Sequence, residues 1–208
     1  AFISLLKKSN PMATNRILIS LITLILPLVI ANSSNAQNWP QFRGPGGNAF
    51  SSDVNIPSTW DDSKNMLWKC DLPGKGASSP IVWKNNIFIT CFTNSAAGIE
   101  RSLICIDKNS GKVLWKSSVK ADVQDDPYSG YLTQHGYASS TPATDGESIF
   151  VFFGKAGVVA FDFSGKELWK TSVGVQSGNR KWGSASSVIL HKDLVIVNAS
   201  EESRAVIG

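Results

Sequence analysis

Short apolar runs alternate with polar turns along most of the chain, and after residue 36 no segment repeats apolar residues at the helical period. The runs at 87–92 and 149–153 contain almost no polar residue, which is typical of strands that are covered on both faces. The pair Asp145-Gly146 precedes the second run, and Asp-Gly is favoured in two-residue hairpins because both central residues need a positive φ. This pattern predicts an all-β protein.

Two short sequences recur in strict alternation. Leu-Trp-Lys places tryptophans at Trp68, Trp115 and Trp169, which are 47 and 54 residues apart. Ala-Ser-Ser occurs at 77–79, 138–140 and 185–187. The repeating interval accommodates four strands, and one such sheet cannot bury two apolar faces alone. Sheets stacked face to face around an axis can, so the repeat predicts a β-propeller of four-stranded antiparallel blades.

The repeat divides the chain into segments, each with a predicted role. In order, we expect an N-terminal segment, a blade, an interblade loop, a second blade and a truncated blade, at 37–76, 77–120, 121–137, 138–173 and 184–208. The strand around Leu67-Trp68-Lys69 precedes the first full blade. We expect it to be the outer strand of a closing blade whose partners come from sequence beyond the third unit.

The beginning of the chain has the order of a secretion signal. Arg16 follows Met12, an apolar run extends from 17 to 30, and Ser34-Asn35-Ala36 offers small residues at the positions that signal peptidase needs. The run of 14 residues is shorter than the roughly 20 that span a bilayer, which disfavours the alternative of a membrane anchor.

These features define the mature chain that we expect. The predicted signal peptide covers 12–36, and the mature protein begins at Gln37 without a membrane span. Residues 1–11 precede the only plausible start methionine and are predicted to be upstream translation.

Composition and charge exclude several classes of protein. The chain has 208 residues, of which 17% are charged and 42% hydrophobic, an ordinary balance for a folded protein. The net charge of +4 arises mainly from Lys7, Lys8 and Arg16, because residues 1–36 contain no acidic residue. The rest of the chain is close to neutral, so we expect no nucleic-acid partner.

The three cysteines, Cys70, Cys91 and Cys105, show no metal-binding or haem-binding spacing. We predict that they are small buried strand residues. The alternative in an exported chain is one disulfide and one free thiol.

Two sequence motifs resemble those of a known family. Cys105-x-Asp107-x-x-Ser110-Gly111-Lys112-x-x-Trp115 resembles the tryptophan-docking motif of quinoprotein-type β-propellers, and 160–169 resembles it with one turn residue deleted. The motif positions are Cys105, Asp107, Gly111, Trp115, Ala160, Asp162, Gly165 and Trp169. The opening at 39–48 resembles the start of exported bacterial proteins with repeats like those that bind pyrroloquinoline quinone (PQQ).

The resemblance covers 39–208 and indicates the PQQ-like repeat family, which includes BamB-like proteins of the outer membrane and PQQ-dependent dehydrogenases. It implies that the motif tryptophan packs between neighbouring blades against the small residue of the motif. We therefore expect Trp115 and Trp169 to be buried. Rings of this family have seven or eight blades, so we interpret the chain as the N-terminal fragment of such a ring.

The best candidate for contact with a ligand or partner is the predicted interblade loop. It holds Tyr128, Tyr131 and His135, and loops on a rigid scaffold often carry binding residues. A self-packed surface loop is the alternative. A calcium site at the aspartates of this loop is weaker, because their spacing lacks the alternating ligands and terminal Glu of an EF-hand. These aspartates are Asp122, Asp125 and Asp126.

The Ala-Ser-Ser segments offer a second candidate. Each begins the innermost strand of a blade, so their hydroxyls could ring one mouth of the central channel. The alternative is backbone capping and tight packing near the axis.

No catalytic residue or metal site can be assigned from the motifs. We therefore predict an exported binding or scaffold module in the periplasm or cell envelope, with an envelope protein or a small polar ligand as its partner. The main alternative is the N-terminal part of a PQQ-dependent alcohol or sugar dehydrogenase, for which the resemblance implies PQQ with calcium. A calcium-stabilised extracellular adhesion module is a third, less favoured interpretation.

Overall fold

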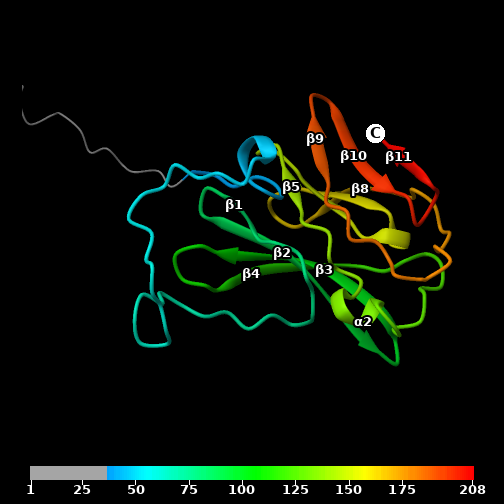
Figure 1. The fold of residues 1–208 in the computed structure, drawn as a ribbon, viewed down its shortest axis with the longest axis horizontal. Coiled ribbons are helices and arrows are strands. Elements are labelled where there is room, and N and C mark those ends of the chain that lie inside the picture. Colours follow the sequence, from blue (N-terminus) through cyan, green and yellow to red (C-terminus); the bar gives the residue numbers. More distant parts are fainter. Residues whose placement is uncertain (1–36) are drawn as a thin grey trace, which may run out of the picture. The chain divides into compact units, whose positions relative to one another are not determined.

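Three antiparallel sheets make up the part of the chain that the computed structural model describes, residues 37–208 (Figure 1). The first sheet contains β1 (Ile81–Trp83), β2 (Asn86–Ser95), β3 (Gly98–Asp107) and β4 (Val113–Val119). The second contains β5 (Ala143–Thr144), β6 (Ile149–Phe152), β7 (Val158–Phe161) and β8 (Glu167–Thr171). The third contains β9 (Ile189–His191), β10 (Leu194–Ala199) and β11 (Ala205–Ile207). The predicted signal peptide and upstream segment lie outside the described residues.

Each strand pairs with its neighbour in sequence, as the repeat predicts, so the all-β prediction is confirmed. The helical segments of the described chain are one short α-helix, α2 (Leu132–His135), and two 3₁₀ turns, η2 (Pro45–Gly47) and η3 (Gly154–Ala156). The sequence pattern did not reveal α2, because four residues are too few to show a helical period. Within the described residues, no helix is both long and apolar enough to cross a membrane.

The first two sheets share one irregularity. The pairing of β3 with β4 shifts in register after Cys105, and the pairing of β7 with β8 shifts after Ala160. These are the two small residues of the repeated motif. The same bulge at the same motif position shows that the sequence repeat is also a structural repeat.

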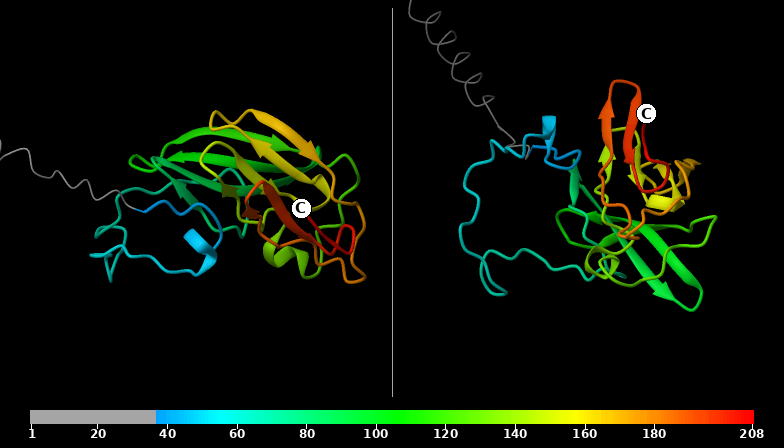
Figure 2. Two further views of the ribbon diagram at one scale, coloured as in Figure 1. Left: turned by 90° about the horizontal axis from the view of Figure 1, so that it is seen from above. Right: turned by 45° about the vertical axis from the view of Figure 1, so that its right-hand side comes forward.

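The second sheet is buried on both faces. Alternate residues of β6 and β7 point to opposite sides, as the period of a strand requires. Val151 and Val159 belong to the apolar cluster shared with the first sheet, whereas Phe152 and Ala160 belong to the cluster shared with the third. The sheets therefore lie next to one another as stacked layers (Figure 2). This accounts for the unbroken apolar run at 149–153.

The cysteines are free and unequally buried. Cys91 and Cys105 lie in the interior, and Cys70 is partly exposed outside the strands, where it packs against the outer face of the first sheet. Burial raises the pKa of the Cys105 thiol to about 12. The expectation of buried packing residues is met by Cys91 and Cys105, and the alternative disulfide is not formed.

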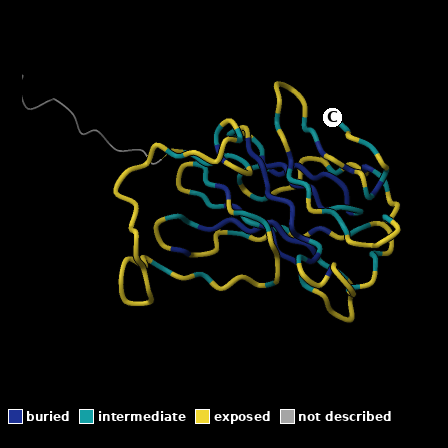
Figure 3. Tube along the Cα trace, viewed as in Figure 1, coloured by how far each residue is buried: buried dark blue, intermediate teal, exposed yellow. Residues whose placement is uncertain are grey.

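The segment before the first sheet is the most exposed part of the described chain (Figure 3). Residues 50–60 form no strand, and Val54 and Trp60 are more than two thirds exposed. Leu67-Trp68-Lys69 belongs to no strand of the described residues. Its role as the outer strand of a closing blade therefore stays a prediction.

Candidate binding site

The aspartate of each docking motif organises the turn that follows it. Asp107 Oδ1 accepts hydrogen bonds from the Ser110 amide at 2.7 Å and from the Ser110 hydroxyl. Asp162 accepts the equivalent bonds from Ser164. The side-chain hydrogen bond of the serine is the main reason that the pKa of each carboxyl is lowered. The motif therefore encodes a rigid turn at the edge of each blade.

Each of these turns receives a tryptophan that precedes it in the chain. Trp115 Nε1 donates to the Phe163 carbonyl at 3.0 Å, and a Cβ at Gly165 would lie 2.7 Å from the Trp115 ring. In the same way, Trp68 Nε1 donates to the carbonyl of Lys108 at 2.8 Å and its ring covers Gly111. The turn glycine thus leaves room for the indole of the neighbouring unit.

The structure bears on two expectations about the tryptophans. The docking contact from one unit to the next is made with the turn glycine, and Trp115 also packs against the apolar cluster that contains Cys105, its partner across β3 and β4. Trp115 is half-buried, whereas Trp169 is 41% exposed, so the expected burial of Trp169 is not found. The physical reason is that no turn equivalent to 162–166 follows β11 within the described residues.

A chain of hydroxyl–amide bonds links the starts of the innermost strands. The Ser79 amide donates to the Thr141 hydroxyl at 3.0 Å, and the Thr141 amide donates to the Ser187 hydroxyl at 3.1 Å. Strand register makes these three residues equivalent, because each lies two positions before the first residue of β1, β5 or β9. We call this series the hydroxyl ladder. It shows that backbone capping is one task of these hydroxyls.

The ladder also shows that the Ala-Ser-Ser segments are not structurally aligned throughout. Ser79 and Ser187 are third in their segments, but Thr141 follows the second segment by one residue. The second unit is therefore shifted by one position relative to the sequence repeat. Since a hydroxyl occupies the ladder position in all three units, the shift preserves the hydrogen bonds.

A concavity of about 900 Å³ opens beside the ladder. We call it the mouth concavity. Its lining combines hydroxyl and small residues from all three units with the 41–47 segment, one imidazole and one guanidinium. The imidazole belongs to His135 and the guanidinium to Arg43, and Ser186 lies in the same lining. No carboxylate belongs to its lining.

The candidate residues of the interblade loop separate into two groups. Tyr128 turns inward, where its ring contacts Phe92 and Tyr137 at centroid distances of 5.6 and 5.8 Å. Its hydroxyl donates to the Thr133 carbonyl. Tyr128 is therefore part of the packing of the loop, as the self-packed alternative predicted for it.

Tyr131 and His135 instead join residues of the next interblade segment. The centroids of the Tyr131 and Trp182 rings lie 5.2 Å apart. The Arg180 guanidinium lies over the Trp182 ring, 4.9 Å from its centroid. His135 Nε2 is 2.7 Å from the Trp182 carbonyl, and Nδ1 is 2.7 Å from the Ser139 hydroxyl. Sequence reasoning missed Arg180 and Trp182, because the repeat gave no sign that the two loops meet.

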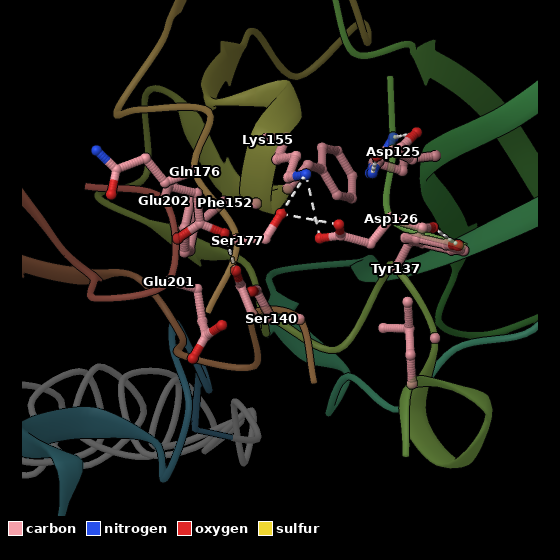
Figure 4. Close-up of a pocket in the computed structure, with 17 residues that line it drawn as sticks. Asp125, Asp126, Tyr137, Ser140, Phe152, Lys155, Gln176, Ser177, Glu201 and Glu202 are labelled. Atoms are coloured by element: carbon pink, nitrogen blue, oxygen red, sulfur yellow. Dashed lines mark hydrogen bonds and ion pairs between the residues drawn. The ribbon is translucent and has the colours of Figure 1, made fainter. Parts of the chain in front are cut away.

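The three aspartates considered for calcium are each paired with a cation. Asp125 pairs with the buried Arg101, and Asp122 pairs with Lys170 at 2.8 Å. Asp126 lies 3.1 Å from Lys155 and accepts a hydrogen bond from Ser177 (Figure 4). These ion pairs occupy the carboxylates, and no group of three or more Asp, Glu, His or Cys within 37–208 is arranged to hold a metal.

Unlike these three aspartates, Glu202 forms no ion pair with a cation among the described residues. It is 3% exposed, its Oε1 accepts from the Ser184 hydroxyl, and its buried Oε2 has no partner. Burial raises the pKa of its carboxyl. The neighbouring Glu201 accepts from the Gly178 amide at 2.9 Å.

The mouth concavity does not fit the cofactor of the dehydrogenase alternative. Calcium in proteins takes six to eight oxygen ligands, commonly including carboxylates. The described lining offers hydroxyls and amides but no carboxylate, and its one charged side chain is the cation Arg43. PQQ held by calcium therefore has no suitable ligand set among these residues.

Comparison with known proteins agrees with the repeat architecture. A family profile described as outer membrane protein assembly factor BamB matches residues 61–207. A search of curated proteins found no match. The matched region contains all three sheets and both docking turns, so the chain belongs to the PQQ-like, BamB-type family of β-propeller proteins.

Proposed function

We propose that this chain is an exported binding module that engages a partner protein of the cell envelope through its mouth concavity. The observation that carries the proposal is the concavity itself, to which three successive units and the 41–47 segment each contribute. A site assembled from rigid repeats is preorganised, which lowers the entropic cost of binding. The description of the family as an outer membrane protein assembly factor supports a protein partner in the envelope.

The lining suits binding better than catalysis. It presents hydroxyl and amide groups at the starts of the innermost strands, and such groups fix the orientation of a bound molecule. The hydroxyls of Thr141 and Ser187 already accept backbone hydrogen bonds within the ladder. His135 is held by Ser139 and the Trp182 carbonyl, so it positions the loops around the concavity.

Site-specific photo-crosslinking in intact cells tests the proposal. A photoreactive residue is placed at Ser186, in the lining, and in a control protein at Lys166, which is exposed on a docking turn. We expect a crosslinked protein partner from position 186 and none from position 166. A sugar- or alcohol-oxidising activity that requires added PQQ, without a crosslink at position 186, would favour the dehydrogenase alternative.

A further inference from the structure

The segment 38–47 lies along the inner edge of the first sheet (Figure 1). Within that sheet β1 pairs only with β2, which leaves the other edge of β1 open to the segment. The Trp39 amide donates to the Val82 carbonyl at 2.8 Å, and the Val82 amide donates to the Trp39 carbonyl at 2.9 Å. Asn38 extends this contact, since its Oδ1 accepts from the Lys84 amide at 2.7 Å.

The same segment also bonds to the second blade. Successive residues of an extended chain point their backbone groups to opposite sides. The Pro40 carbonyl therefore points away from β1, and it accepts from the Thr144 amide of β5 at 2.9 Å. Proline has no amide hydrogen, so its presence here leaves no donor unpaired. Residues 39–40 thus lie between the inner edges of two neighbouring blades.

Val82 and Thr144 are equivalent positions of these blades. Each lies three residues after its member of the hydroxyl ladder, Ser79 or Thr141. Both are therefore at the far end of β1 and β5, close to the turns that lead into β2 and β6. The inner edges of innermost strands face the central channel of a propeller. The segment accordingly occupies the channel at the end opposite to the ladder.

A compact turn fixes the rest of the segment. Gly44 has a φ of 72° and lies under the Trp39 ring, where an added Cβ would be 2.7 Å from the ring atoms. The Gly44 amide donates to the Gln41 carbonyl at 2.9 Å, and the Ala49 amide donates to the Arg43 carbonyl at 2.8 Å. The segment is therefore a folded unit that is anchored to two blades.

We propose that residues 38–47 form a built-in plug of the axial channel, which closes it at the β1–β2 and β5–β6 turns and clamps the first two blades together. Residues 41–47 also line the mouth concavity, so the plug forms its floor. A ligand then reaches the axis from the ladder end, and the plug stays in place while a partner is bound. This inference goes beyond the proposed function, to which it adds the direction from which the partner approaches.

Disulfide trapping in the full-length protein tests the position of the plug. Trp39 and Val82 are opposite residues of an antiparallel bridge, in which the Cα atoms are about 5.5 Å apart, a distance that a disulfide can span. In a Cys70→Ser background, we expect Trp39→Cys with Val82→Cys to form this disulfide in most molecules, as read by mass spectrometry of unreduced peptides. The control pairs Trp39→Cys with Leu190→Cys, the equivalent position of the third blade, and should form little disulfide. Absence of the 39–82 disulfide, or equal formation of both, would overturn the plug.

Amide exchange tests whether the plug covers the inner edges of both blades. Gly44→Ala should displace the ring above it and release the segment, so the Val82 and Thr144 amides should exchange about tenfold faster. Gly46→Ala is the matched control, because Gly46 has a φ of 70° but no atom of the described chain within 4 Å of an added Cβ. It should leave both amides as slow as in the wild type. The Thr141 amide, which is bonded within the ladder, should stay protected in both variants and shows that the sheets remain folded. Fast exchange of Val82 and Thr144 already in the wild type would contradict the plug.

The disulfide-locked variant separates the plug from the proposed function. With the photoreactive residue at Ser186, the 39–82 disulfide should leave capture of the partner unchanged. Capture that is lost in the locked form and restored by reduction would show that the segment must leave the channel, which overturns a plug that stays in place. No capture in either form would contradict the proposed function, while the disulfide and exchange results would still decide the plug.

Discussion

The glycine of each docking turn is the residue on which the contact between neighbouring units depends. Gly111 and Gly165 both have a positive φ, of 69° and 86°, and both lie under an indole. Two independent requirements therefore exclude a side chain at each position. Replacing the glycine would strain the turn that the aspartate organises and would displace the tryptophan ring that lies over it.

We predict that Gly165→Ala lowers the free energy of unfolding by about 2–4 kcal/mol. The added Cβ would strain the backbone and displace the Trp115 ring, from which it would lie 2.7 Å. Gly130→Ala is a matched control, because Gly130 has a φ of 57° but no atom within 4 Å of an added Cβ. Denaturant unfolding should show a loss of only about 1 kcal/mol for the control. Equal losses for the two variants would mean that the indole contact contributes little.

The buried carboxyl of Glu202 should make the stability of the protein depend on pH. Its pKa is raised mainly by burial, and a folded-state pKa above the unfolded value means that the folded state binds the proton more tightly. The stability that the protonated form contributes is present below the ordinary value of 4.5 and is lost as pH rises through the folded-state pKa. Glu202→Gln should therefore be about 1 kcal/mol more stable than the wild type at pH 7.

At pH 4 the same comparison should show a much smaller difference, because the carboxyl is then mostly protonated in both states. The exposed Glu147 provides the control variant Glu147→Gln, for which no gain is expected. Thermal unfolding at the two pH values measures both. A Glu202→Gln variant that is less stable at pH 7 would show that the unpartnered Oε2 has a favourable partner when ionised.

At the scale of elements, the hydroxyl ladder connects the three sheets at the start of their innermost strands. Thr141 takes part in both bonds, since its hydroxyl accepts from Ser79 and its amide donates to Ser187. It is buried, with 2% of its surface exposed. Loss of its hydroxyl would leave the Ser79 amide without its partner.

We predict that Thr141→Val lowers the free energy of unfolding by about 1–3 kcal/mol, the cost of an unsatisfied buried donor. Valine has nearly the same shape as threonine, so the change isolates the hydrogen bond. Thr141→Ser keeps the hydroxyl and should retain more of the stability. If the serine variant were as unstable as the valine variant, the methyl group rather than the hydroxyl would be the important part.

The elements also show which features the sequence could reveal. Strand order and double-sided burial followed from the apolar runs, because strand periodicity is local. The contact between Tyr131 and Trp182 could not be predicted, since it depends on how two interblade loops approach each other. The exposure of Trp169 was missed for a related reason. The motif identifies a docking tryptophan but not the turn that receives it.

Over the whole molecule, the described residues form three stacked sheets of one repeat family, with hydroxyl groups gathered at the starts of the innermost strands. The family and the antiparallel sheets are established. The binding function is our proposal. It places the partner over 41–47, α2 and 182–188, away from the docking turns at 107–112 and 162–166.

Hydrogen–deuterium exchange of the full-length protein, alone and with the crosslinked partner, tests this placement most directly. Bound partner should slow amide exchange in 41–47, 131–139 and 182–188, because these segments line the concavity or contact residues that line it. Exchange in the exposed 50–60 segment and in both docking turns should not change. Protection confined to the docking turns, or no protection around the mouth concavity, would contradict the account.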